Sequence, residues 1–207
     1  LLTVWREHGS TAVMGRVISV FDDDADPWVL ATGTFHRPPR VTGTPLQVAA
    51  SGNLLLDMHQ VRALGVRFDE SLGLGGGEDT LFSRELVARG GTIVWCNESE
   101  TEDPVVAHRV TRAWATQRAF SSANSLVHVE LRLAPDRGGR LRCRGSALAG
   151  GSARVVVGFG RHLYGRARSQ LVDDARGLRT LHRGRGMVAA AFGHRFHEYA
   201  RPSEPNS

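Results

Sequence analysis

The sequence predicts an α/β protein with a helical C-terminal appendage. Apolar stretches typical of buried strands alternate with segments whose apolar residues recur at helical spacing. Capping residues mark the expected starts and ends of these helices. Hydrophobic residues make up 41% of the 207 residues, which is enough for a packed core in most of the chain.

The first expected elements are extended. Residues 10–21 are rich in valine, isoleucine and other apolar residues, and are predicted to form a strand. The segment from Pro27 to Pro45 contains four prolines and two glycines, so we expect a loop. Residues 46–56 are predicted to be extended again, with a break at residues 51–53.

Two short helices come next. One is expected from Asp57, a suitable N-cap, to just before Gly65, a suitable C-cap. A second should open at Glu78-Asp79 and run to about Arg89, because acidic residues suit the positive end of the helix dipole. The elements expected after these are a buried strand at residues 92–96 and a third helix at about 108–126.

The composition changes after Leu133. Residues 137–140 are rich in arginine and glycine and are predicted to be a linker. Residues 146–165 and 186–200 are predicted to form weak amphipathic helices. We therefore divide the chain into a first domain, residues 1–133, and a basic helical tail, residues 134–207.

Charge is distributed unevenly along the chain. The net charge is +5, and all 26 basic residues are arginines. Acidic residues concentrate before Pro104, whereas arginine far outnumbers them after Leu131. Arginine binds phosphate and carboxylate groups in a bidentate way, so the tail is expected to favour anionic partners.

Other features indicate the compartment. Cys96 and Cys143 have neither metal-ligand spacing nor a disulfide pattern, which favours a reducing compartment. The sequence has no apolar run as long as a membrane-spanning helix needs. Residues 1–6 do not resemble a signal peptide, and the chain begins without Met, so we expect a fragment or a shortened protein. We expect a cytoplasmic protein, with peripheral attachment to the inner face of the plasma membrane.

The pattern that points most directly to chemistry is a glycine-rich loop followed by two carboxylates. Residues 73–77 include four glycines, and Glu78 and Asp79 follow at the predicted start of a helix. Backbone amides are unpaired there and can bind an incoming group, while a glycine loop allows close approach of a substrate. Two adjacent carboxylates repel each other, which favours one of them as a proton acceptor. Taken alone, these residues could equally be dipole-compensating acids after a linker.

The surrounding residues resemble family 2 of the GT-A glycosyltransferases, especially members that assemble bacterial exopolysaccharides of the succinoglycan type. The resemblance covers about residues 10–130 and, more loosely, the tail. The segments that carry it are Gly52–Leu56, Phe68–Glu70, Gly76–Asp79, Arg89–Trp95, Arg109, Trp114–Phe120 and Phe192–Tyr199.

The resemblance implies a partial GT-A (Rossmann-like) fold and transfer of a sugar, with inversion, from a nucleotide-sugar donor to a glycan or lipid-linked acceptor. It implies that Asp79 is the catalytic base and that Glu78 positions the acceptor or the loop. Glu102 would take the place of a metal-side residue, although a solvated carboxylate explains it equally well. The residues assigned to substrate binding are Asn53, Gly76, Gly77, Arg109 and Arg118.

The resemblance also implies a nucleotide-binding half with an Asp-x-Asp motif. We expect that half, and most of the site for a divalent cation (Mg²⁺ or Mn²⁺), to lie outside this sequence, so this chain alone should have little or no transferase activity. Asp22-Asp23-Asp24 could be the motif. A solvated acidic turn explains these residues better, because they lie too close to Gly76.

Two other functions remain open. The chain could be a non-catalytic accessory module that keeps only acceptor- or membrane-binding residues. It could also be a basic protein that binds phosphate or nucleic acid, although no recognised nucleic-acid motif is present. For the tail, we expect an anionic membrane surface as partner and no nucleic acid, with an ordinary arginine-rich helical appendage as the alternative.

Overall fold

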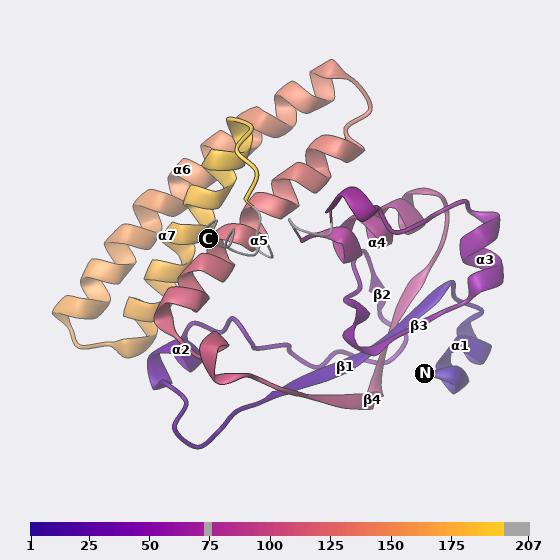
Figure 1. Ribbon diagram of the computed structural model, residues 1–207, viewed down its shortest axis with the longest axis horizontal. Coiled ribbons are helices and arrows are strands. Elements are labelled where there is room, and N and C mark those ends of the chain that lie inside the picture. The colour runs from indigo at the N-terminus through magenta and orange to yellow at the C-terminus, as the bar shows by residue number, and fades with distance from the viewer. Residues whose placement is uncertain (73–75, 197–207) are drawn as a thin grey trace, which may run out of the picture.

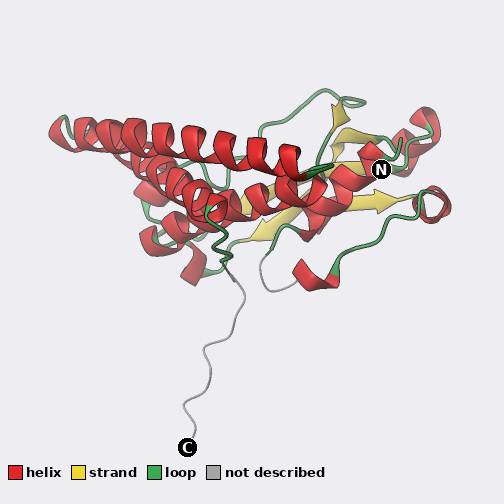
Figure 2. Cartoon of the chain, turned by 90° about the horizontal axis from the view of Figure 1, so that it is seen from above, coloured by secondary structure: helices red, strands yellow, loops and turns green. Residues whose placement is uncertain are grey.

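The computed structural model describes residues 1–72 and 76–196. These residues form a mixed α/β fold, with a sheet at one end of the molecule and long helices gathered at the other (Figure 1, Figure 2). The sheet has four strands in the order β2-β4-β1-β3. The strands are β1 (Ala12–Val20), β2 (Pro45–Leu46), β3 (Leu54–Leu56) and β4 (Ile93–Pro104).

The sheet is mixed because β1 runs parallel to β4, whereas β3 and β2 run antiparallel to β1 and β4 respectively. The strand predicted at residues 10–21 is confirmed as β1. The strand predicted at 92–96 is only the first part of β4. The prediction stopped too early because residues 97–103 are mostly polar and lie at the surface, where hydrophobicity does not mark a strand.

Short helices cover both faces of the sheet. On one face, α3 (Met58–Ala63) and α4 (Glu78–Ala88) bury Val61, Phe82 and Leu86 against alternate strand residues. On the other face, α1 (Leu2–His8) packs Val4 against Val13. Residues that face opposite sides of the sheet therefore alternate along β1 and β4, as the pleat of a strand requires.

The predicted helices near the sheet are confirmed, but two short ones were missed. Asp57 caps α3 by accepting hydrogen bonds from the next turn, and α4 begins at Glu78 as expected. The sequence did not indicate α1, and α2 (Pro27–Ala31) lies in the segment predicted to be a loop. Asp26 caps α2 and Pro27 opens it, a combination that marks a helix start even where prolines follow.

Three long helices complete the described part: α5 (Arg112–Leu133), α6 (Arg137–Ala167) and α7 (Leu171–Ala191). The predicted linker at 137–140 is instead the first turn of α6, because Asp136 caps it by accepting from the Gly139 amide. The helix predicted at 186–200 is corrected in part, since α7 ends at Ala191; residues 197–200 lie outside the described residues. None of the helices in the described part of the chain is long and apolar enough to span a membrane.

Glycines allow α6 and α7 to approach each other closely. A Cβ atom on Gly158 would lie 2.4 Å from the Leu181 nitrogen, and one on Gly177 would lie 2.4 Å from the His162 nitrogen. α7 lies between α6 and α5 (Figure 1) and also packs against α2. The division into domains at residue 133 stays a prediction.

Candidate functional site

The start of α4 depends on two glycines in left-handed conformations. Gly76 has φ 68° and Gly77, the N-cap of α4, has φ 98°. Residues other than glycine rarely adopt such backbone angles without strain. A Cβ atom on Gly77 would also lie 3.3 Å from the Cβ of Ser125 on α5. These glycines therefore set the first turn of α4 closely against α5.

The carboxylate of Asp79 is held through one of its oxygens. Asp79 Oδ2 accepts hydrogen bonds from the Ser51 backbone nitrogen at 3.1 Å and from Ser51 Oγ at 3.0 Å. Ser83 Oγ donates to the Asp79 carbonyl at 2.7 Å and accepts from the Ala49 nitrogen at 3.0 Å, which ties α4 to the same segment. Within the residues that the structure describes, Oδ1 of Asp79 makes no hydrogen bond.

Glu78 differs from its neighbour. Its Oε2 atom is buried and has no hydrogen-bond partner among the described residues. Buried carboxylate oxygens almost always accept hydrogen bonds, so a buried oxygen without one indicates a missing donor. The helix start thus presents one fixed carboxylate, Asp79, beside one that lacks a donor.

Asn53 lies near the start of α4, but its side chain is hydrogen-bonded to backbone carbonyls. Its Nδ2 donates to the carbonyls of Arg16 at 3.1 Å and Ser99 at 3.0 Å, across the bulge where β1 and β4 change register. A Cβ atom on Gly15 would lie 2.3 Å from Asn53 Nδ2, so only glycine leaves room for this side chain. Asn53 shares the short 3₁₀ turn of Ser51, and its contact with an acceptor stays a prediction.

Arg109 and Arg118 belong to a separate group. Both line a pocket of about 390 Å³ between the N-terminal part of α5 and the loop after α2. The rings of Phe35 and Trp114 stack in its wall, with centroids 5.4 Å apart. Neither Glu78 nor Asp79 lines this pocket. Its lining residues are Thr34, Phe35, Arg37, Asp103, His108, Arg109, Trp114, Gln117 and Arg118.

The sequence did not indicate that Phe35, Arg37 and Gln117 would join this pocket. Phe35 and Arg37 lie in a loop without regular spacing, and their position depends on the packing of Phe35 against Trp114. An aromatic residue inside a proline-rich loop was the available signal, because such a residue needs a packing partner.

The predicted metal ligand, Glu102, and the three aspartates at residues 22–24 all lie at the surface. Glu102 is exposed and pairs with Ile18 in the β1–β4 ladder. Residues 22–24 are also exposed, in the turn between β1 and α2. Across residues 1–72 and 76–196, no three His, Cys, Asp or Glu side chains gather closely enough to hold a metal ion. Metal binding by Glu102 therefore has no support from the described residues and stays a prediction.

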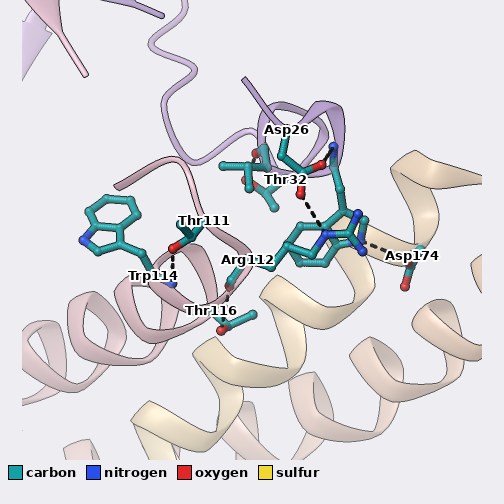
Figure 3. Close-up of polar contacts among 9 residues, drawn as sticks. Asp26, Thr32, Thr111, Arg112, Trp114, Thr116 and Asp174 are labelled. Atoms are coloured by element: carbon teal, nitrogen blue, oxygen red, sulfur yellow. Dashed lines mark hydrogen bonds and ion pairs between the residues drawn. The ribbon is translucent and has the colours of Figure 1, made fainter. Parts of the chain in front are cut away.

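Next to residues 22–24, a polar contact joins α2 to α5 and α7 (Figure 3). Asp26 accepts from the Trp28 backbone nitrogen at 2.8 Å and from Arg112 Nε at 2.8 Å. The hydrogen bond from Arg112 holds the pKa of Asp26 below its usual range. Trp28 Nε1 donates to Asp174 Oδ2 at 2.9 Å, and the Arg112 guanidinium lies 5.2 Å from the centroid of the Trp28 ring. The Trp114 side chain points away from this contact (Figure 3).

The two groups of candidate residues are connected through α5. Arg118, in the pocket wall, and Ser125, beneath Gly77, are seven residues apart on this helix, a rise of about 10 Å. A single helix therefore positions both the pocket and the acidic turn at Glu78-Asp79.

Comparison with known proteins supports the resemblance to proteins of succinoglycan biosynthesis. The succinoglycan biosynthesis protein ExoM of Rhizobium meliloti (strain 1021) is 34% identical to this chain over 126 residues. That match covers 60% of this chain and 40% of that protein, so the chain spans about two fifths of the length of this relative. No model of a protein family matches the chain, and no solved structure matches it. The predicted relationship to a protein of exopolysaccharide biosynthesis is thereby confirmed.

Proposed function

We propose that this chain is the acceptor-side part of an inverting, family-2 glycosyltransferase with a GT-A fold, acting in bacterial polysaccharide biosynthesis. The observation that carries the proposal is the acidic start of α4, where Ser51 fixes one oxygen of Asp79 and leaves the other available. The identity to ExoM, whose name places it in succinoglycan biosynthesis, supports a role in the same kind of polysaccharide biosynthesis.

Asp79 acts as the general base in this proposal. Its free Oδ1 takes the proton of an acceptor hydroxyl while the hydroxyl oxygen forms a bond to the anomeric carbon of the donor sugar. The bond between that carbon and the phosphate oxygen breaks, and the nucleoside diphosphate leaves with the bonding electrons. Because the attack comes from the face opposite the leaving group, the anomeric configuration inverts.

Glu78 and the α5 pocket orient the substrates. Glu78 positions the acceptor or the loop before α4 in this proposal, and its buried Oε2 lacks a hydrogen-bond donor among the described residues. Arg109 and Arg118, beside the Trp114 ring, suit a substrate that carries both a sugar ring and a negative charge. Gly76 and Gly77 keep the approach to Asp79 open.

Donor binding is proposed to involve residues outside this sequence. The family resemblance implies Mg²⁺ or Mn²⁺ at the donor diphosphate, but the described residues offer no matching set of ligands. We therefore assign no step to a metal ion on this chain. We propose a cytoplasmic location, where nucleotide sugars are the donors.

The test uses an exchange of matching segments. The 126 matched residues of this chain replace those of ExoM, and sugar transfer from nucleotide donors to membrane glycolipid is measured. Asp79→Asn should lower transfer about 100-fold or more, the scale of losing a general base. Thr80→Ser, one residue further along α4, is the matched control.

Each outcome decides between the functions. Transfer that depends on Asp79, with an inverted product by NMR, supports the transferase. Unchanged transfer by Asp79→Asn in an active exchanged protein would mean that this segment is an accessory binding module. If the exchanged protein is inactive, saturation-transfer NMR of the chain with acceptor oligosaccharides replaces the assay; contacts that Asp79→Asn weakens support the site, and absence of contacts contradicts it.

A further inference from the structure

Helix α6 has an unusual distribution of side chains around its axis. The side that faces α7 is lined by small residues, with Gly151, Gly158 and Gly165 repeated every seven residues. Four large apolar side chains lie on the opposite side and are exposed, with the exposed ring of Phe159 beside them. We call this side of the helix the α6 outer stripe, which consists of Ala149, Ala153, Val156, Val157, Gly160, Leu163, Tyr164 and Ala167.

The helical period explains this arrangement. Val156 and Leu163 are seven residues apart, as are Val157 and Tyr164, so each pair lies on nearly the same side of the helix. Gly158 and Gly160 are two residues, or about 200°, apart; the first contacts α7 and the second has nothing within 4 Å. In most soluble proteins a helix turns its large apolar side chains inward, so α6 is inverted.

The exposure of the outer stripe is substantial. Its four large residues, Val156, Val157, Leu163 and Tyr164, are between 48% and 71% exposed. The stripe extends over 19 residues from Ala149 to Ala167, a rise of about 27 Å. An apolar surface of this length usually marks an interaction site.

The charges next to the stripe indicate the sign of the charge that a partner would carry. α6 contains seven arginines and no acidic residue. Arg154, Arg161 and Arg168 follow one edge of the stripe at intervals of seven, with Arg166 on the other edge. Arg161 pairs with Asp173 at 2.7 Å. The side chains of Arg166 and Arg168 make no hydrogen bond or ion pair within the described part of the chain.

We propose that the outer stripe of α6 docks on the surface of an anionic lipid bilayer. Exposed apolar side chains enter the boundary between head groups and acyl chains, while arginines along both edges contact lipid phosphates. A second copy of this chain fits less well, because pairing two stripes would bring rows of arginine together. The proposal is independent of the transferase chemistry, since none of these residues belongs to the acidic turn or the α5 pocket.

The first experiment reports on the stripe itself. In the full chain with Cys143→Ser, an environment-sensitive fluorophore is attached at Val157→Cys, and in a control chain at Val41→Cys, which is 81% exposed and lies near the sheet. Vesicles of phosphatidylglycerol and phosphatidylcholine should shift the emission at position 157 toward the blue and leave position 41 unchanged. Phosphatidylcholine vesicles alone should give a smaller shift.

The second experiment measures the contribution of charge. Arg166→Gln with Arg168→Gln should lower the partition coefficient onto anionic vesicles roughly 30-fold at low salt, because each arginine near the surface contributes about a factor of five. The matched control is Arg62→Gln with Arg67→Gln, which removes the same charge from exposed sites near α3. High salt should weaken the binding of the unmodified chain to anionic vesicles and reduce the difference in binding between the two double variants.

Three results would overturn the proposal. One is a label at position 157 that does not respond to anionic vesicles. Another is an equal response at positions 41 and 157, or an equal loss for both arginine pairs, which would indicate general electrostatic adsorption. The third is a label whose emission shifts with protein concentration in the absence of lipid, together with a dimer in light scattering, which would show that a second copy covers the stripe.

Discussion

Replacing Gly158 with alanine tests the contact between α6 and α7 directly. A Cβ atom there would lie 2.4 Å from the Leu181 nitrogen and 2.8 Å from the Gly177 oxygen, both backbone atoms. Ordinary contact begins at 3.4 Å, so the helices would have to separate by about 1 Å. No side chain can rotate away to relieve the overlap, because the neighbouring atoms belong to the backbone.

The magnitude follows from a matched variant on the same helix. Gly160 has nothing within 4 Å of its Cβ position, so Gly160→Ala gains about 1 kcal/mol of helix propensity without a clash. Gly158→Ala gains the same propensity, and the difference between the two variants therefore isolates the steric cost. Overpacking typically costs about 1–3 kcal/mol, and we expect the upper end of this range.

The assay is thermal unfolding followed by the helical circular dichroism signal. For a chain of this size, 1 kcal/mol shifts the melting temperature by about 2–4 °C, so a 3 kcal/mol cost separates the two variants by about 6–12 °C. Gly160→Ala should melt above the unmodified chain and Gly158→Ala below it. Equal melting temperatures, or a more stable Gly158→Ala, would refute the close packing and the inverted arrangement of α6 that depends on it.

Three further predictions concern the acidic turn and pH. Gly77→Ala should cost about 1–2 kcal/mol of unfolding free energy from its left-handed backbone and also lower transfer in the exchanged protein, whereas Gly90→Ala, with φ 91° away from the site, should cost stability alone. Ser51→Ala should weaken transfer several-fold by removing one donor to Asp79, and unchanged activity would mean that the backbone amide suffices. Burial lowers the pKa of His182 below the ordinary 6.5, so the unfolded chain protonates first; stability should fall as pH drops through 6.5, and His182→Gln should flatten that part of the urea-midpoint profile.

The sequence indicated the elements whose signals are local. Asp57 and Glu78 mark helix starts through capping and dipole effects, which depend on a few neighbouring residues. The strand of β1 was recognised because both of its faces are largely buried and therefore apolar. Those signals would be the same in any fold that uses these segments.

Features that depend on distant residues were not predictable in this way. Asn53 occupies the bulge between β1 and β4 only because Gly15 leaves space and Ser99 offers a carbonyl, and these residues are far apart in the sequence. Likewise, the glycines of α6 suggested a linker or a weak helix, since glycine lowers helix propensity. Their seven-residue spacing has meaning only opposite Gly177 and Gly184, which provide the matching surface on α7.

Helix α5 makes the arrangement of the tail relevant to the candidate site. A Cβ atom on Gly186 of α7 would lie 2.2 Å from the Phe120 carbonyl oxygen, and Asn124 Nδ2 donates to the Gly186 carbonyl at 3.2 Å. These contacts lie on α5 between Arg118, in the pocket wall, and Ser125, beneath Gly77. Because packed helices move as rigid bodies, a displacement of α7 at this point would move the pocket wall and the support of the acidic turn together. The helices after residue 133 therefore help to position both groups of candidate residues, in addition to presenting the outer stripe of α6.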